Sequence, residues 1–265
     1  MKSIIQHIKL HISSLFNFKN YTFLLCTLIL IGCSSDNAGG TANDAGSFSE
    51  NGQGGSLARF AIYQDYLYVV DESDLNVFAI TNREQPVLVN SIPIGFNIET
   101  LFNYKNYLYI GSRNGMFIYS VTNPELPSYM SDVQHFTACD PVVANDTHAF
   151  VTLHTNIGCG IDINVLEIYD VTDVTNPILI SSRNLVRPIG LGLFGDYLFV
   201  CDDELKVFDV SNPESSQLVT SIDVEAFDVI INNGKLVLIG DNGLYQYSLD
   251  NNDITNITHL STINI

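Results

Sequence analysis

Acidic and basic side chains recur near one position of a repeated unit, and they are the first candidates for chemistry in this sequence. Five similar aromatic-aliphatic segments begin at residues 66, 107, 148, 197 and 235. The residues eight positions before these starts are Ala58, Glu99, Asp140, Ile189 and Phe227. Asp228 follows the last of these, and Arg187 lies two residues before Ile189. Paired carboxylates can act as general acid and base, and an arginine among them can bind a polar ligand. We therefore interpret Glu99, Asp140, Arg187 and Asp228 as candidates for a polar site. The alternative is that Asp140-Pro141 and its equivalents only shape the turn that leads into each strand.

Cysteine and histidine form a second group of candidates. An oxidising compartment, argued below, makes a disulfide the default for exported cysteines. We predict a bridge between Cys139 and Cys159, because both are expected to open on the same face of the fold, and His154 lies on that side too. Cys201 is then the odd cysteine and a buried thiol, although it remains a competitor for Cys159.

Two metal sites compete with these interpretations. His135, Cys139, His154 and Cys159 could offer two nitrogens and two sulfurs to zinc, but their spacing matches no zinc finger. His148 occupies a position that holds tyrosine in other repeats, which favours a structural role. Acidic runs at 71–74, 202–204 and 241–242 could offer oxygens to calcium, but Asp and Asn are also the residues that hairpin turns require. We expect no metal and no cofactor.

The elements that must position these residues are strands in five copies. The sequence contains five aromatic-aliphatic segments, at 66–69, 107–110, 148–151, 197–200 and 235–238. Each is followed by another strand, which begins at Leu75, Met116, Leu166, Leu205 or Leu244. Strand repeats about forty residues apart are typical of a β-propeller, whose blades bury their faces against their neighbours. We predict an all-β fold with five four-stranded blades at about 58–97, 98–137, 138–187, 188–226 and 227–265.

The ends of the repeated region fall between blades. Residues 58–63 supply the inner strand of the first blade, and residues 259–265 supply the outer strand of the last. We therefore expect no strand exchange between the termini, and we expect the ring to close by side-chain packing. The first positions of the inner strands would then line one mouth of the central channel.

The repeated phrase itself resembles a known family. LEIYDVTDVTNPILISS at 166–182 and LKVFDVSNP at 205–213 are similar to the LVIVD repeat, whereas Ala79 replaces the expected aspartate in the first copy. The fifth copy, LYQYSLDNND, is degenerate and lacks the proline. The resemblance implies a propeller of the kind found on bacterial surface lipoproteins, and it implies no shared activity.

The first residues carry a targeting signal. Residues 1–32 combine three lysines with an apolar run at 21–31, which is too short to span a bilayer but is typical of a secretory signal. Leu30-Ile31-Gly32-Cys33 resembles a bacterial lipobox, which implies cleavage before Cys33 and acylation of that cysteine. Residues 33–57 are rich in Gly, Ser and Asn, as flexible tethers are. Residues 58–265 are then one anchored domain.

Charge excludes one class of partner. The chain has a net charge of −18, and loss of the three leader lysines leaves 8 basic against 29 acidic residues, or −21. Such a surface repels nucleic acid. We therefore predict a lipid-anchored binding or scaffolding module of the cell envelope, on the outer membrane of a Gram-negative bacterium, with an envelope protein or glycan as partner. It would touch the membrane through its lipid only.

An enzyme is the alternative from another class. Axial carboxylates converging on a deep pocket could serve a glycan lyase or hydrolase, although the sequence has no nucleophile elbow, phosphate-binding glycine loop or HExxH helix.

We predict that the functional face is on the side of Asp140 and of the insertion at 154–164, because the repeat is lengthened there and because loops on a rigid scaffold usually form binding sites.

Overall fold

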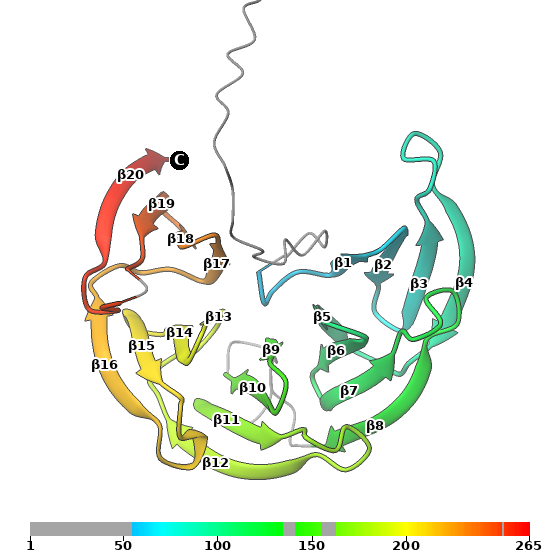
Figure 1. Cartoon of the computed structure of the whole chain (residues 1–265), viewed down its shortest axis with the longest axis horizontal. Coiled ribbons are helices and arrows are strands. Elements are labelled where there is room, and N and C mark those ends of the chain that lie inside the picture. The colour runs from blue at the N-terminus through cyan, green and yellow to red at the C-terminus, as the bar shows by residue number, and fades with distance from the viewer. Residues whose placement is uncertain (1–54, 135–140, 155–162, 251) are drawn as a thin grey trace, which may run out of the picture. The chain divides into compact units, whose positions relative to one another are not determined.

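The computed structural model describes residues 55–134, 141–154, 163–250 and 252–265, which form five antiparallel sheets of four strands (Figure 1). Within every sheet the strands follow chain order, and no strand crosses from one sheet to another. The sheets are arranged as the blades of a propeller (Figure 1). The predicted all-β fold of five four-stranded blades without strand exchange is confirmed. No helix in these described ranges is long and apolar enough to cross a membrane.

Each blade runs from an inner strand near the axis to an outer strand at the rim. Blade 1 contains β1 (Phe60–Tyr63), β2 (Tyr66–Val70), β3 (Asp74–Ala79) and β4 (Val87–Pro93). Blade 2 contains β5 (Ile98–Tyr104), β6 (Tyr107–Ser112), β7 (Gly115–Ser120) and β8 (Ser128–Gln134). Blade 3 contains β9 (Val142–Ala144), β10 (His148–Leu153), β11 (Val165–Asp170) and β12 (Ile178–Asn184).

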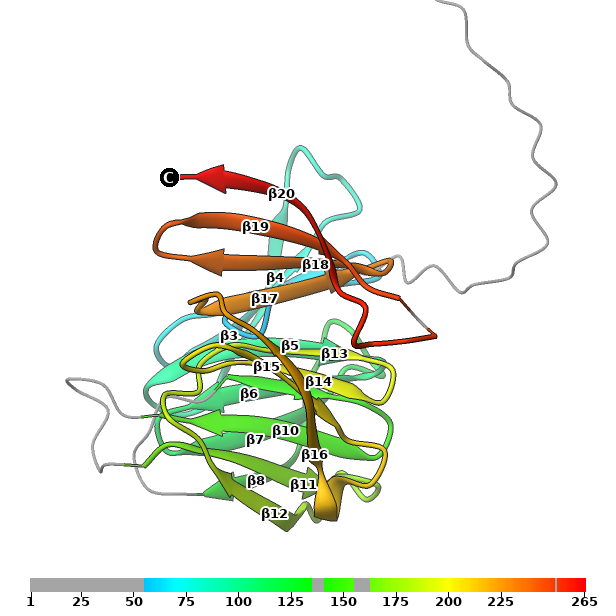
Figure 2. The same cartoon turned by 90° about the vertical axis from the view of Figure 1, so that its left-hand side faces the viewer.

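The last two blades follow the same order. Blade 4 contains β13 (Leu191–Phe194), β14 (Tyr197–Cys201), β15 (Leu205–Asp209) and β16 (Gln217–Ile222), with a 3₁₀ turn, η1, at Pro213–Ser215. Blade 5 contains β17 (Asp228–Asn232), β18 (Lys235–Gly240), β19 (Gly243–Ser248) and β20 (Thr258–Asn264). From the side, β17, β18 and β19 lie together and β20 forms the outer edge (Figure 2).

A break in the strand register recurs at one position of the repeat. The pairing of the third strand with the fourth shifts immediately before an aromatic residue in all five blades: Phe78, Tyr119, Tyr169, Phe208 and Tyr247. Such irregularities bend a strand and increase its twist. The outer strand of each blade therefore turns away from the inner three, as propeller blades require.

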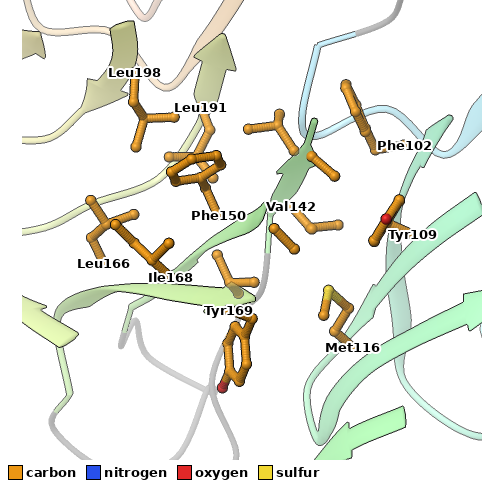
Figure 3. Packing of buried hydrophobic residues seen from close by; sticks show 14 of the residues in the cluster. Phe102, Tyr109, Met116, Val142, Phe150, Leu166, Ile168, Tyr169, Leu191 and Leu198 are labelled. Atoms are coloured by element: carbon orange, nitrogen blue, oxygen red, sulfur yellow. The ribbon is translucent and has the colours of Figure 1, made fainter. Parts of the chain in front are cut away.

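Aromatic side chains on the second strands fill the junctions between blades. The equivalent residues Tyr68, Tyr109, Phe150 and Phe199 are at most 1% exposed. Phe150 shows the arrangement, because it packs with Leu191 and Leu198 of blade 4 in a cluster that also includes Tyr109 and Met116 of blade 2 (Figure 3). Each of the four junctions that follow blades 1 to 4 therefore buries one aromatic side chain against the aliphatic residues of the next blade, which contributes hydrophobic stabilisation.

The junction between blade 5 and blade 1 differs from the other four. In blade 5 the aromatic position holds Val237, which is half-buried, and Gln246 replaces an aliphatic residue that is buried in blades 1 to 4. On the facing side of blade 1, Leu67 and Phe78 are half-buried, although their equivalents in the other blades are buried. The three buried clusters join blades 1 and 2, blades 2 to 4, and blades 4 and 5. Among the described residues, buried hydrophobic clusters therefore join four of the five pairs of neighbouring blades. The side-chain packing that we expected to close the ring does not form such a cluster between blades 5 and 1.

Candidate functional site

Asp228 lies at the predicted mouth of the channel, but its carboxylate binds the chain's own N-terminal segment. Its Oδ1 accepts a hydrogen bond from the Ser56 hydroxyl at 3.3 Å and from the backbone N–H of Val229 at 2.9 Å. The backbone N–H groups of Ser56 and Leu57 also bond to this carboxylate. Ser56 in turn accepts the N–H of Leu191 at 2.7 Å, so one serine joins the lead-in of blade 1 to blades 4 and 5. We call the segment Gly55–Leu57 with Asp228 the axial clasp.

Burial controls the chemistry of the axial clasp. Ser56 and Asp228 are both buried, and burial raises the pKa of Asp228 although its hydrogen bonds oppose that change. A Cβ placed on Gly55 would lie 2.1 Å from the Asp228 carboxylate, so the contact has no room for a side chain. The sequence interpretation assigned Gly55–Leu57 to the flexible tether, because Gly and Ser carry no hydrophobic pattern. The role of this segment follows from its contact with Asp228, which lies 172 residues after Ser56 in the chain, so no local sequence pattern indicates it.

Glu99 belongs to a separate pocket at the junction of blades 1 and 2. The pocket has a volume of about 470 Å³ and is lined by Arg59, Glu72, Asn97, Ile98, Glu99 and Arg113. Arg113 donates from Nε to Glu99 at 2.7 Å, and Arg59 donates to the Ile98 carbonyl at 2.6 Å. The Glu99 carboxylate is therefore engaged by an arginine from its own blade. The sequence interpretation missed Arg59 and Arg113, since neither occupies the repeat position that drew attention to Glu99.

Arg187 lies in the connection between β12 of blade 3 and β13 of blade 4, and His154 lies in blade 3. Arg187 is exposed, and its backbone N–H bonds to the buried carboxylate of Asp202, which also accepts the N–H of Val186 at 3.0 Å. Asp202 is further paired with Lys206 at 2.6 Å. His154 is buried at the end of β10. The structure thus joins Asp228 to Ser56, Glu99 to Arg113 and the Arg187 backbone to Asp202.

The acidic turn at 71–74 binds its own backbone. The Asp71 carboxylate accepts the N–H groups of Ser73 at 2.9 Å and Asp74 at 2.8 Å, and these bonds lower the pKa of Asp71. This is the turn role that the sequence interpretation preferred over calcium binding. Within the part of the chain that the structure describes, no group of three His, Cys, Asp or Glu side chains could hold a metal ion.

Several candidates lie outside the described residues: Cys33, His135, Cys139, Asp140 and Cys159. Cys201, the cysteine that the sequence leaves over, is a buried free thiol whose pKa is raised by burial. The bridge between Cys139 and Cys159 remains a prediction. Closing a loop of about twenty residues would stabilise the domain by about 3 kcal/mol. Peptide mapping without reductant should find these two cysteines linked, and a peptide that joins Cys159 to Cys201 would contradict this pairing.

Comparison with known proteins supports the repeat and the fold. The LVIVD repeat model matches residues 54–93, 103–134 and 190–224, which cover blades 1, 2 and 4. Segment 166–182, one of the two that carried the resemblance in the sequence, is not among these ranges, and the insertion at 154–164 interrupts its repeat. No curated protein matches the chain by sequence.

Two solved structures illustrate the likeness in fold. A protein from Lactobacillus plantarum has 13% identity and a TM-score of 0.63, with 76% of this chain and 69% of that chain covered. The periplasmic gluconolactonase PpgL of Pseudomonas aeruginosa has 13% identity and a TM-score of 0.58, with 76% and 68% covered. At such identities the likeness concerns the fold alone. The chain contains LVIVD repeats and folds as a five-bladed β-propeller.

Proposed function

We propose that this propeller is a lipid-anchored binding or scaffolding module of the cell envelope, held on the outer membrane of a Gram-negative bacterium through Cys33. The lipobox-like sequence Leu30–Cys33 and the Gly- and Ser-rich tether support the anchored, extracytoplasmic location. A rigid ring of blades with exposed turns supports a binding role, because proteins with such scaffolds usually bind their ligands through the loops that the scaffold positions.

The engagement of Asp228 is the observation that favours binding over catalysis. A glycan lyase or hydrolase would need carboxylates that converge on an open pocket, with one of them free to move a proton. Asp228 is buried and holds Ser56 and backbone N–H groups, and Glu99 is paired with Arg113 in a different pocket. The two described axial carboxylates, Asp228 and Glu99, therefore do not converge on one pocket, which favours a binding module over the enzyme alternative.

Replacing the anchor tests this proposal. We expect Cys33→Ser to move the protein from the membrane fraction to the soluble extracytoplasmic fraction, because a serine cannot carry the thioether lipid. Fractionation with immunodetection measures the location, and mass spectrometry of the wild-type N-terminal peptide measures the acyl groups. Cys26→Ser, inside the predicted leader, is the matched control and should stay in the membrane fraction. A wild-type protein without lipid, or a Cys33→Ser variant that stays on the membrane, would contradict the proposal.

A further inference from the structure

Blade 5 contains the second place at which the repeat is lengthened. The connection between the third and fourth strands has seven residues in blades 1 to 4, at 80–86, 121–127, 171–177 and 210–216. In blade 5 it has nine residues, at 249–257, and it lacks the proline of the other blades. The sequence interpretation treated the insertion at 154–164 as the sole lengthening. The longer connection in blade 5 lies beside the turn Asn233-Gly234, on the face of the ring opposite to the start of β17 at Asp228.

The connections of blades 2 and 3 each accept a hydrogen bond from the blade that precedes them. The Tyr68 hydroxyl donates to the Pro124 carbonyl at 2.9 Å, and the Ser131 hydroxyl donates to the Val174 carbonyl at 2.6 Å. The blade 5 connection instead buries Ile254 in the cluster that contains Phe199 of blade 4. A pocket opens beside this anchor, between the end of β13 and the two turns of blade 5.

The pocket has the size of a ligand site and an unusually polar lining. Its volume is about 700 Å³, within the roughly 300–1,000 Å³ range of small-molecule sites. It is lined by Phe194, Asn233, Gly234, Lys235, Ser248, Leu249, Asp250, Asn252, Asn256 and Thr258. Three carboxamides and two hydroxyls can each both donate and accept hydrogen bonds. We call this site the blade 5 pocket.

Two charged groups in the blade 5 pocket balance each other. Lys235 donates to the Ser248 hydroxyl at 3.4 Å, and Asp250 accepts the N–H of Asn252 at 2.8 Å and the amide of Asn256 at 3.4 Å. These bonds, first of all the one from the Asn252 backbone, lower the pKa of Asp250 and keep it charged. The pocket therefore carries no net formal charge, whereas the chain as a whole is strongly acidic. Such surroundings repel anionic ligands and leave neutral ones unaffected.

We propose that the blade 5 pocket binds a neutral oligosaccharide of two to three sugar units. Carboxamides, a lysine and a carboxylate match the mixed donor and acceptor pattern of sugar hydroxyls, and Phe194 supplies an aromatic face for the apolar side of a pyranose ring. The proposal rests on the assignment of the protein as a binding module and specifies the chemistry of its ligand. It places the ligand on the face opposite to the channel mouth.

The test uses the full-length protein in a polyoxyethylene detergent that contains no sugar. Isothermal titration calorimetry would measure binding of cellotriose, maltotriose and triacetylchitotriose, with trigalacturonate as the anionic comparison. We expect at least one neutral trisaccharide to bind. The double variant Asn252→Ala with Asn256→Ala should bind it at least about tenfold more weakly, because two hydrogen-bonding side chains are lost. Phe194→Leu, which retains an apolar side chain in the core, should also weaken binding.

Asn123→Ala is the matched control, since it changes an asparagine in the seven-residue connection of blade 2, and it should bind like the wild type. Thermal denaturation of each variant verifies that the fold is retained. Three results would overturn the proposal: no neutral trisaccharide bound at millimolar concentration, equal binding by the double variant, or a preference for trigalacturonate. None of them alters the outcome of the Cys33→Ser fractionation, so failure of this inference is distinct from failure of the proposed function.

Discussion

Phe208→Ala is expected to lower the free energy of unfolding by about 3–5 kcal/mol, whereas Phe78→Ala should lower it by only about 1–2 kcal/mol. The two phenylalanines occupy the same position of the repeat, directly after the same break in register. Phe208 is 2% exposed, packs in the cluster of blades 2 to 4 and lies 5.2 Å from the Arg183 guanidinium. Phe78 faces the junction between blades 5 and 1, which we call the open junction, and it is half-buried, so its removal leaves little cavity.

Urea denaturation of both variants would measure this difference. Val237→Ala, on the blade 5 side of the same junction, should also have a small effect, because Val237 is already partly in contact with solvent. Equal losses for Phe78→Ala and Phe208→Ala would show that blades 1 and 5 pack against each other in solution as tightly as the other pairs of blades.

Asp228→Ala should destabilise the domain by about 2–4 kcal/mol, because it leaves the buried Ser56 hydroxyl and several backbone N–H groups without their acceptor. Gly55→Ala should also destabilise it, since the added Cβ would lie 2.1 Å from the carboxylate. In the double variant the clash is gone, so the loss should be smaller than the sum of the two single losses. Chemical denaturation of the three variants measures this coupling, and strict additivity would contradict the contact.

The stability contributed by Asp228 should depend on pH in a defined direction. Burial raises its pKa in the folded state above the unfolded value, so the folded protein takes up a proton first as the pH falls. Its contribution is therefore greatest below the unfolded pKa, near 4, and is lost as the pH rises through the raised folded pKa. We expect the stability of the wild type relative to Asp228→Asn to increase when denaturation is measured at acidic instead of neutral pH.

Ser56→Ala provides the control for this measurement. It removes one hydrogen bond to Asp228 and should cost about 1 kcal/mol, but it retains the buried carboxylate. Because the lost hydrogen bond lowers the pKa of Asp228 in the folded state, the variant should keep the direction of the pH dependence and should not weaken it. If the wild type and Asp228→Asn respond identically to pH, Asp228 has the same pKa in the folded and unfolded states.

The architecture was predictable because it is encoded locally and five times. Alternating apolar residues define each strand, as in Leu205 and Val207 against Lys206, and glycine or Asn-Pro turns end it. A unit of about forty residues that contains four such strands can bury its faces only against copies of itself. The number of blades, their order and the absence of strand exchange follow from these patterns, and the structure has all three.

The axial clasp, the open junction and the blade 5 pocket were decided by tertiary structure. Ser56 and Asp228 meet because the ring brings the first and last blades to one axis, and no local pattern relates residues so far apart in the chain. The positions of Val237 and Phe78 look like those of their buried equivalents in sequence, yet the faces they occupy are half-buried. Periodicity specifies which face of a strand is apolar, whereas the packing of the blades determines whether a neighbour covers that face.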